Sequence, residues 1–216
     1  MPVSTGLSRV DSEARTLRAK LLVDGEHYRE LIAGAIARAQ VSVWITTANL
    51  KTMLVEAPIG TRARARGRYI SFFETLSELA QRGVDVCILH ASPPSRPLQA
   101  ELAKCGAKVK MRACPRVHLK MIAVDGGLLY LGSANLTGAG LGAKTEGRRN
   151  FEMGIVTDDE AMLDATQARF DRIWRGLECK GCKLRRECPK PLDMITSRVT
   201  SRGTKTRTSR SPSAPR

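Results

Sequence analysis

The sequence contains no long apolar run and few aromatic residues. No stretch approaches the roughly 18 apolar residues that a membrane helix needs. The N-terminus has polar and acidic residues where a secretory signal would place its apolar stretch. We therefore expect a cytoplasmic protein without a transmembrane segment. Aromatic residues make up 4% of the chain, which argues against a base-stacking surface or an aromatic membrane-interface belt.

Acidic residues are also scarce relative to basic ones. The chain has 21 acidic and 36 basic residues, which gives a formal net charge of +15 at pH 7. Such an excess is typical of proteins whose partner is a polyanion, and the two candidates are nucleic acid and an anionic membrane surface. Because aromatic residues are few, we expect contacts with phosphates and not stacking on bases.

The remaining composition is that of a globular protein with one core. Of the 216 residues, 42% are apolar and 26% are charged. Apolar periodicity alternates between helix-like and strand-like segments, which predicts an α/β fold with a mixed sheet. The expected helices are Glu26–Ala39, Tyr69–Gln81 followed by a Gly83 cap, a short one ending at Lys104, and Asp158–Trp174 with Asp158 or Asp159 as its cap; the expected strands are Val41–Ala48, Val84–Leu89, Ala107–Met111, Val117–Val124, Leu128–Leu131 and Phe151–Val156.

Two segments are unusually basic. In TRARARGR every second residue is arginine, so an extended backbone would point all four side chains to one side. A solvated loop is the alternative interpretation, but the overall charge favours contact with nucleic acid. The candidate nucleic-acid-binding residues are Arg62, Arg64, Arg66, Arg68, Arg148 and Arg149. The last twenty or so residues combine basic side chains with Ser, Thr, Gly and Pro, which predicts a disordered basic tail.

One stretch carries residues suited to phosphoryl transfer. His118 and Lys120 are two positions apart, so in a strand both side chains would face one phosphate. An imidazole can attack phosphorus, and an ammonium can stabilise charge on the phosphoryl oxygens. Ser133 and Asn135 follow closely and supply further donors.

The spacing His-x-Lys-x4-Asp followed by Gly-Ser-x-Asn resembles the signature of the phospholipase D superfamily. It is matched at His118, Lys120, Asp125, Gly132, Ser133 and Asn135. The resemblance implies a phospholipase D-like α/β fold, a mixed β-sheet flanked by helices, present as a single half-domain. We expect an N-terminal arm at 1–20, this catalytic domain at 21–176, a cysteine knuckle at 177–194 and the tail at 195–216.

The resemblance also implies a mechanism through a phosphohistidine. Lys120 and Asn135 would hold the non-bridging oxygens, Ser133 would add a donor, Asp125 would organise the site, and Glu152 would orient the imidazole. No cofactor is expected for catalysis. Such chemistry needs two histidines, and neither His27 nor His90 is followed by lysine two residues on. A homodimer is therefore expected to bring two copies of His118 together.

The resemblance indicates that the substrate contains a phosphodiester bond, but it does not identify the substrate. The net charge favours a nuclease acting on DNA or RNA through phosphate contacts. A phospholipase D-type hydrolase or transferase acting on anionic phospholipid is the alternative. A non-catalytic nucleic-acid-binding module is a third.

The close spacing of three cysteines predicts a metal-binding knuckle. Cys179 and Cys182 are separated by two residues, and Cys188 follows. Cys114 is the preferred fourth ligand, with Cys105 and Cys87 as alternatives. We expect structural zinc; an iron–sulfur cluster, or cysteines that are unligated or redox-active, remain open.

Overall fold

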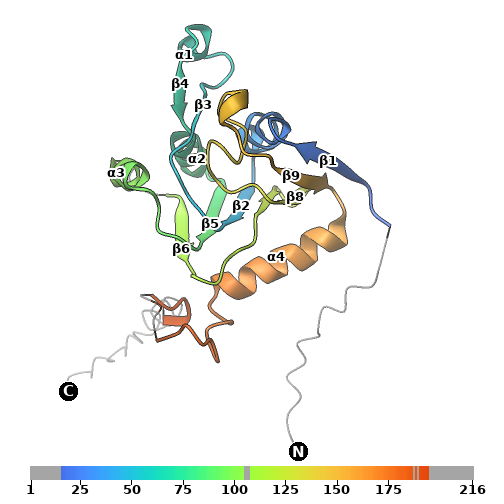
Figure 1. Ribbon diagram of the computed structural model, residues 1–216, viewed down its shortest axis with the longest axis vertical. Helices are drawn as coiled ribbons and strands as arrows, with labels where there is room; N and C mark the ends of the chain where they lie inside the picture. Colours follow the sequence, from blue (N-terminus) through green and yellow to red (C-terminus); the bar gives the residue numbers. More distant parts are fainter. Residues whose placement is uncertain (1–15, 105–107, 187, 189, 195–216) are drawn as a thin grey trace, which may run out of the picture.

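A seven-stranded mixed sheet forms the centre of the molecule (Figure 1). The computed structural model describes residues 16–104, 108–186, 188 and 190–194. The strand order is β1-β9-β8-β7-β2-β5-β6; β5 and β6 are parallel to β2, and the other pairs are antiparallel. The strands are β1 (Ala19–Val23), β2 (Ser42–Thr47), β5 (Asp85–His90), β6 (Lys110–Ala113), β7 (Met121–Val124), β8 (Leu128–Gly132) and β9 (Met153–Thr157). The predicted mixed α/β sheet is confirmed.

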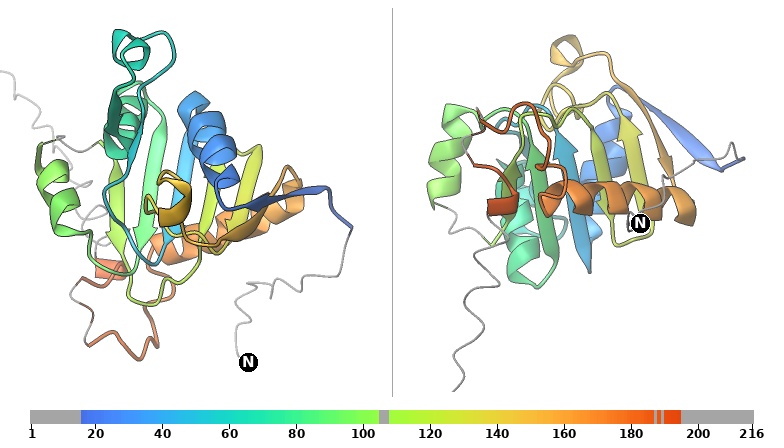
Figure 2. Two further views of the ribbon diagram at one scale, coloured as in Figure 1. Left: turned by 45° about the horizontal axis from the view of Figure 1, so that its top comes forward. Right: turned by 90° about the horizontal axis from the view of Figure 1, so that it is seen from below.

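Helices cover both faces of this sheet, as Figure 2 shows. One face packs against η1 (Tyr28–Ala35), η2 (Ile36–Arg38), α2 (Phe72–Gln81) and α3 (Arg96–Lys104); the other packs against α4 (Glu160–Trp174). The alternation of strand side chains explains the two cores. In β2, Val43 and Ile45 enter the first core, whereas Trp44 enters the second. There Trp44 stacks on Phe170, with ring centroids 5.0 Å apart.

Most predicted elements are present, with shifted ends. The predicted Gly83 cap is confirmed: Gly83 has a φ of 100°, and the amide of Val84 bonds back to Leu79 at the end of α2. Asp159 caps α4 by accepting the amide hydrogen of Met162. Strand β1 was not predicted, because Leu22 is its one buried side chain and the apolar pattern is therefore weak.

The expected extended arrangement of the four arginines is wrong. Residues Arg62–Ala65 form a short helix, α1, because Thr61 accepts the amide hydrogen of Arg64 as an N-cap. Gly67 has a φ of 64°, which ends the turn. Side chains two positions apart do not share a helix face, so Arg64 points to a different side from Arg62 and Arg66.

Helix α1 lies at the tip of a small hairpin that projects from the sheet (Figure 1). The hairpin strands are β3 (Leu54–Glu56) and β4 (Tyr69–Ser71), which pair antiparallel. Among the described residues, no helix is long and apolar enough to cross a membrane.

Candidate active site

One edge of the sheet collects the polar residues of the motif. Strand β2 runs towards this edge, and the antiparallel strand β7 begins there, because Thr46 pairs with Met121. Strand β8 ends at the same edge, and β9 begins beside it, because Gly132 pairs with Gly154. Residues just before β7 and β9, and just after β2 and β8, therefore converge. His118, Lys120, Ser133, Asn135 and Glu152 all occupy these positions.

His118 and Lys120 meet as expected, although they precede strand β7 and do not belong to it. The Lys120 ammonium nitrogen lies 3.3 Å from each ring nitrogen of His118, and it donates to the main-chain oxygen of His118 at 3.0 Å. His118 is exposed and Lys120 is partly buried. The imidazole and the ammonium are thus both accessible to a single phosphate.

Asn135 is anchored by its amide oxygen. That oxygen accepts hydrogen bonds from the amides of Ala48 and Asn49 at 3.2 and 3.1 Å, and from the Thr47 hydroxyl at 3.3 Å. These partners follow or end β2, so the loop after β8 is tied to a central strand. Because the oxygen is satisfied, the NH2 group of Asn135 is the end left to donate to a ligand.

Glu152 is buried at this edge, and its carboxylate is held by two side chains. The Ser133 hydroxyl donates to one carboxylate oxygen, and Asn150 donates to the other at 3.0 Å. None of the hydrogen bonds described for Glu152 reaches His118. The expected orienting contact with the imidazole therefore stays a prediction, and within the described chain Glu152 acts first on Ser133.

Three residues that support the site were not predicted. Asn150 holds Glu152, and Asp24 accepts the Glu152 amide hydrogen at 2.9 Å. The Asp24-Gly25 pair is a turn signal, but nothing local indicates a partner so far along the chain. Tyr130 accepts the amide hydrogen of Ala134 at 3.3 Å, and burial raises the pKa of its hydroxyl to about 12.

Asp125 lies at the opposite edge of the sheet from the other motif residues. It follows β7, whereas His118 precedes that strand, so the length of the strand separates them. Its carboxylate accepts the amide hydrogens of Gln40, Val41 and Ser42 at 2.7 to 2.9 Å. Asp125 therefore fixes the start of β2. None of its described hydrogen bonds reaches the other motif residues, and its expected role in organising the site stays a prediction.

The candidate arginines are not brought together by the structure. Arg148 is exposed in η3 (Glu146–Arg148), four residues before Glu152, and Arg149 donates to the Lys144 carbonyl at 2.6 Å. Arg64 is paired with Glu56. The hairpin that carries α1 is inserted between the end of β2 and the start of α2, but Arg64 lines a pocket with Arg38 and Arg82, which precede β2 and β5. The tip of the hairpin therefore lies towards the edge opposite the motif residues.

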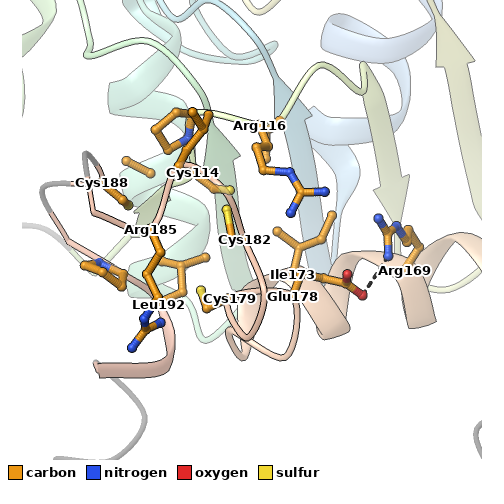
Figure 3. A pocket seen from close by; sticks show the side chains of 15 residues that line it. Cys114, Arg116, Arg169, Ile173, Glu178, Cys179, Cys182, Arg185, Cys188 and Leu192 are labelled. Carbon is orange, nitrogen blue, oxygen red and sulfur yellow. Dashed lines mark hydrogen bonds and ion pairs between the residues drawn. The ribbon is translucent and has the colours of Figure 1, made fainter.

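The four cysteines of the predicted knuckle line one pocket. Cys114 comes from the loop after β6, and Cys179, Cys182 and Cys188 come from the segment after α4 (Figure 3). No three His, Cys, Asp or Glu side chains among the described residues are spaced as ligands of a metal ion. Cys87 is buried in β5, away from this pocket, and Cys105 lies outside the described residues.

Comparison with known proteins places the chain in a family. A family model described as "Cardiolipin synthase, PLD-like domain" matches residues 32–174, which is more than half of the chain. No curated protein sequence matches. Among solved structures, NucT from Helicobacter pylori is similar at a TM-score of 0.51 and 19% identity, over 73% of this chain and 95% of that chain.

Two further structures have the same kind of likeness. Nuc from Salmonella typhimurium, described as a phospholipase D family member, has a TM-score of 0.49 and 21% identity over 73% of this chain and 95% of that chain. Phosphatidylserine synthase from Haemophilus influenzae has a TM-score of 0.48 and 16% identity over 75% of this chain and 39% of that chain.

The fold, a mixed sheet flanked by helices, is that of a phospholipase D-like domain. The chain belongs to the phospholipase D superfamily, whose members hydrolyse or transfer phosphodiesters.

Proposed function

We propose that the protein is a nuclease that cleaves phosphodiesters of nucleic acid without a catalytic metal, through a phosphohistidine at His118. The observation that carries the proposal is the convergence of His118, Lys120 and Asn135 at one edge of the sheet. An exposed imidazole, an ammonium 3.3 Å from it and an oriented amide donor are the groups that an in-line displacement at phosphorus requires.

The first step forms a bond between a ring nitrogen of His118 and phosphorus. The bond to the leaving oxygen breaks, and a second imidazole donates a proton to that oxygen. Lys120 and the NH2 group of Asn135 stabilise the non-bridging oxygens. In the second step water gives its proton to the second imidazole and attacks phosphorus, which releases His118. These cationic and amide donors do what divalent ions do in metal-dependent nucleases.

The second imidazole is supplied by another copy of the chain. His27 and His90 are both buried, so neither offers an exposed ring to a phosphate at this edge. Exposed apolar side chains flank the site: Phe151 is 97% exposed, Met153 58% and Leu119 45%. Val23 in β1 is the strand partner of Met153 in β9, and its side chain is also exposed. Apolar residues grouped in this way mark a surface that another protein covers, which supports a homodimer assembled over the site.

Nucleic acid is the substrate that the charge of the chain favours. A net charge of +15 attracts a polyanion, and contacts with phosphates do not depend on base sequence. The hairpin with α1 carries Arg62 and Arg66, both exposed, and projects beyond the sheet. A long phosphate backbone can reach the hairpin and the site together, which a single lipid headgroup cannot.

The test is turnover by the purified protein and its His118→Ala variant, with chelator present. The substrates are single-stranded DNA, double-stranded DNA, RNA and anionic phospholipid vesicles. We expect cleavage of nucleic acid that the variant loses by at least about a thousandfold, as for removal of a nucleophile. Headgroup release alone would replace the nuclease with a lipid-acting phosphodiesterase. Nucleic acid binding with no turnover on any substrate would instead support a non-catalytic module.

A further inference from the structure

The chain after α4 folds into a loop whose two ends touch. This segment, residues 177–192, is called the C-terminal loop below. Gly176 has a φ of 76°, and a Cβ atom on it would lie 2.2 Å from the main-chain nitrogen of Asp193. Only glycine permits this approach. Arg169 and Arg172 also bond to Glu178, at 2.8 and 3.0 Å, which ties the start of the loop to α4.

Among its described residues, the interior of the C-terminal loop makes few contacts, which include the ion pair of Arg185 with Asp193. Among its described residues there is no helix or strand, and its main-chain hydrogen bonds include three successive turns, which close at Cys179, Cys182 and Arg185. Leu192 is buried, but Leu177 and Leu184 are exposed. A loop of this length with few apolar contacts needs another source of stability, and in small domains that source is often a disulfide or a metal ion.

The cysteines are the residues placed to supply it. The turns from Gly176 to Cys179 and from Cys179 to Cys182 put two cysteines close together, and Gly181, with a φ of 77°, allows the second turn. Figure 3 shows Cys114 and Cys182 pointing towards each other across the pocket. All four knuckle cysteines, from two segments far apart in the sequence, line this one pocket.

The charge around the pocket suits an anionic metal–thiolate centre. A zinc ion with four thiolate ligands carries a net negative charge, which neighbouring cations stabilise. Arg116 lines the pocket together with the cysteines (Figure 3). Arg185 lines the same pocket.

We propose that the pocket is a structural zinc site with the ligands Cys114, Cys179, Cys182 and Cys188. In the described structure the sulfur atoms surround the pocket without the spacing of a metal complex. Binding of zinc draws them to about 2.3 Å from one centre. The loop can make this movement because turns, and no helix or strand, connect its described cysteines.

The site connects the C-terminal loop to the segment that carries the nucleophile. Cys114 donates its amide hydrogen to the His90 carbonyl at 2.8 Å, and it accepts the Val117 amide hydrogen at 2.9 Å. His118 is the next residue. A zinc ion bound to Cys114 therefore restrains the chain segment that leads to His118, although the ion takes no part in the reaction.

The first test is metal analysis of the full chain, made with zinc in the medium and purified with reductant but without chelator. We expect about one zinc ion per chain, as for a four-thiolate structural site. Cys182→Ser and Cys114→Ser are expected to lose most of it. Cys87→Ala is the matched control and should keep it, because the Cys87 thiol is buried and donates to Asp85 at 3.6 Å.

A second test needs no variant and so does not depend on how the variants fold. Alkylation of the wild-type protein, followed by mass spectrometry, should show the four pocket cysteines protected with zinc and modified after its removal. Cobalt in place of zinc should give the visible absorption of a tetrahedral thiolate complex. Wild-type protein that neither contains nor binds zinc would overturn the proposal, as would iron with the absorption of an iron–sulfur cluster. Full zinc retention in Cys114→Ser would show that Cys114 is not the fourth ligand.

Discussion

Glu152 is the residue whose surroundings say most about the site. It is a buried carboxylate, and buried carboxylates are retained where partners satisfy them. Here Ser133 and Asn150 do so, and Asp24 holds the main chain on the same side. This arrangement fixes the position of the Ser133 hydroxyl, which lies two residues before Asn135.

Replacement of this carboxylate is expected to slow the reaction while the fold is kept. In Glu152→Gln the amide keeps the shape but cannot accept hydrogen bonds at both ends, so the contact with Ser133 or Asn150 is weakened. We expect kcat to fall about a hundredfold, the loss that a misplacement of about 1 Å in the site can cause, with a melting temperature within a few degrees of wild type. Glu146→Gln, on an exposed residue of the same loop, is the control. An unchanged kcat would show that Glu152 has no part in the reaction.

Asp125 is expected to act on stability and not on turnover. Burial alone would raise the pKa of its carboxyl, but the amides of Ser42, Gln40 and Val41 outweigh this and lower it. A lowered native pKa stabilises the fold above the ordinary carboxyl pKa of about 3.9, and the contribution is lost as pH falls below that value.

Asp125→Ala should therefore unfold more easily at neutral pH. Because the carboxylate is exposed, we expect a loss of about 1–2 kcal/mol in unfolding free energy and no more. Denaturant unfolding at several pH values measures it. The difference from wild type should shrink as pH falls below about 4, and kcat of the folded protein should stay within about twofold. A large loss of kcat at full stability would return Asp125 to the catalytic residues.

At the scale of elements, local chemistry determines what the sequence reveals. Helix α2 and its Gly83 cap, and the cap at Asp159, could be predicted because each rests on contacts within a few residues. Strand β1 could not, since its pairing with β9 involves residues more than a hundred positions away. The same limit applies to the site. The motif identifies His118 and Lys120, but Asn150 and Asp24 become visible only when the strands are assembled.

The arginine hairpin is the element expected to contact nucleic acid outside the cluster of motif residues. Arg62, Arg66 and Arg68 are exposed, whereas Arg64 is paired with Glu56. Changing these three exposed arginines to glutamine should weaken nucleic acid binding. It should also reduce the slope of log affinity against log salt by up to about 3, because each lost phosphate contact removes about 1.

The control removes the same charge from the other face of the sheet. Lys180, Lys183 and Arg186 are exposed, and they follow α4, which covers the face of the sheet opposite the core that the hairpin strands join. Their triple glutamine variant should keep the salt slope of wild type. Binding isotherms at several salt concentrations measure both slopes. Equal slopes for the two triple variants would mean that the net charge of the protein, and not the position of the hairpin arginines, governs binding.

At the scale of the whole molecule, the proposed mechanism makes the chain half of an active site. The edge cluster holds one exposed imidazole, whereas a displacement with a phosphohistidine needs two. The apolar residues Phe151, Met153 and Leu119 surround this edge, where a second copy would cover them. Under this mechanism two chains form one composite site.

Subunit mixing tests this feature most directly. Wild-type protein and an equal amount of the His118→Ala variant are allowed to exchange subunits, and nuclease activity is then measured. If both copies of His118 serve one site, mixed dimers are inactive and activity falls to about a quarter of that of the same total of wild type, since random pairing leaves that share of intact dimers. Activity that stays at about half would mean that each chain works alone, and this would contradict the shared site.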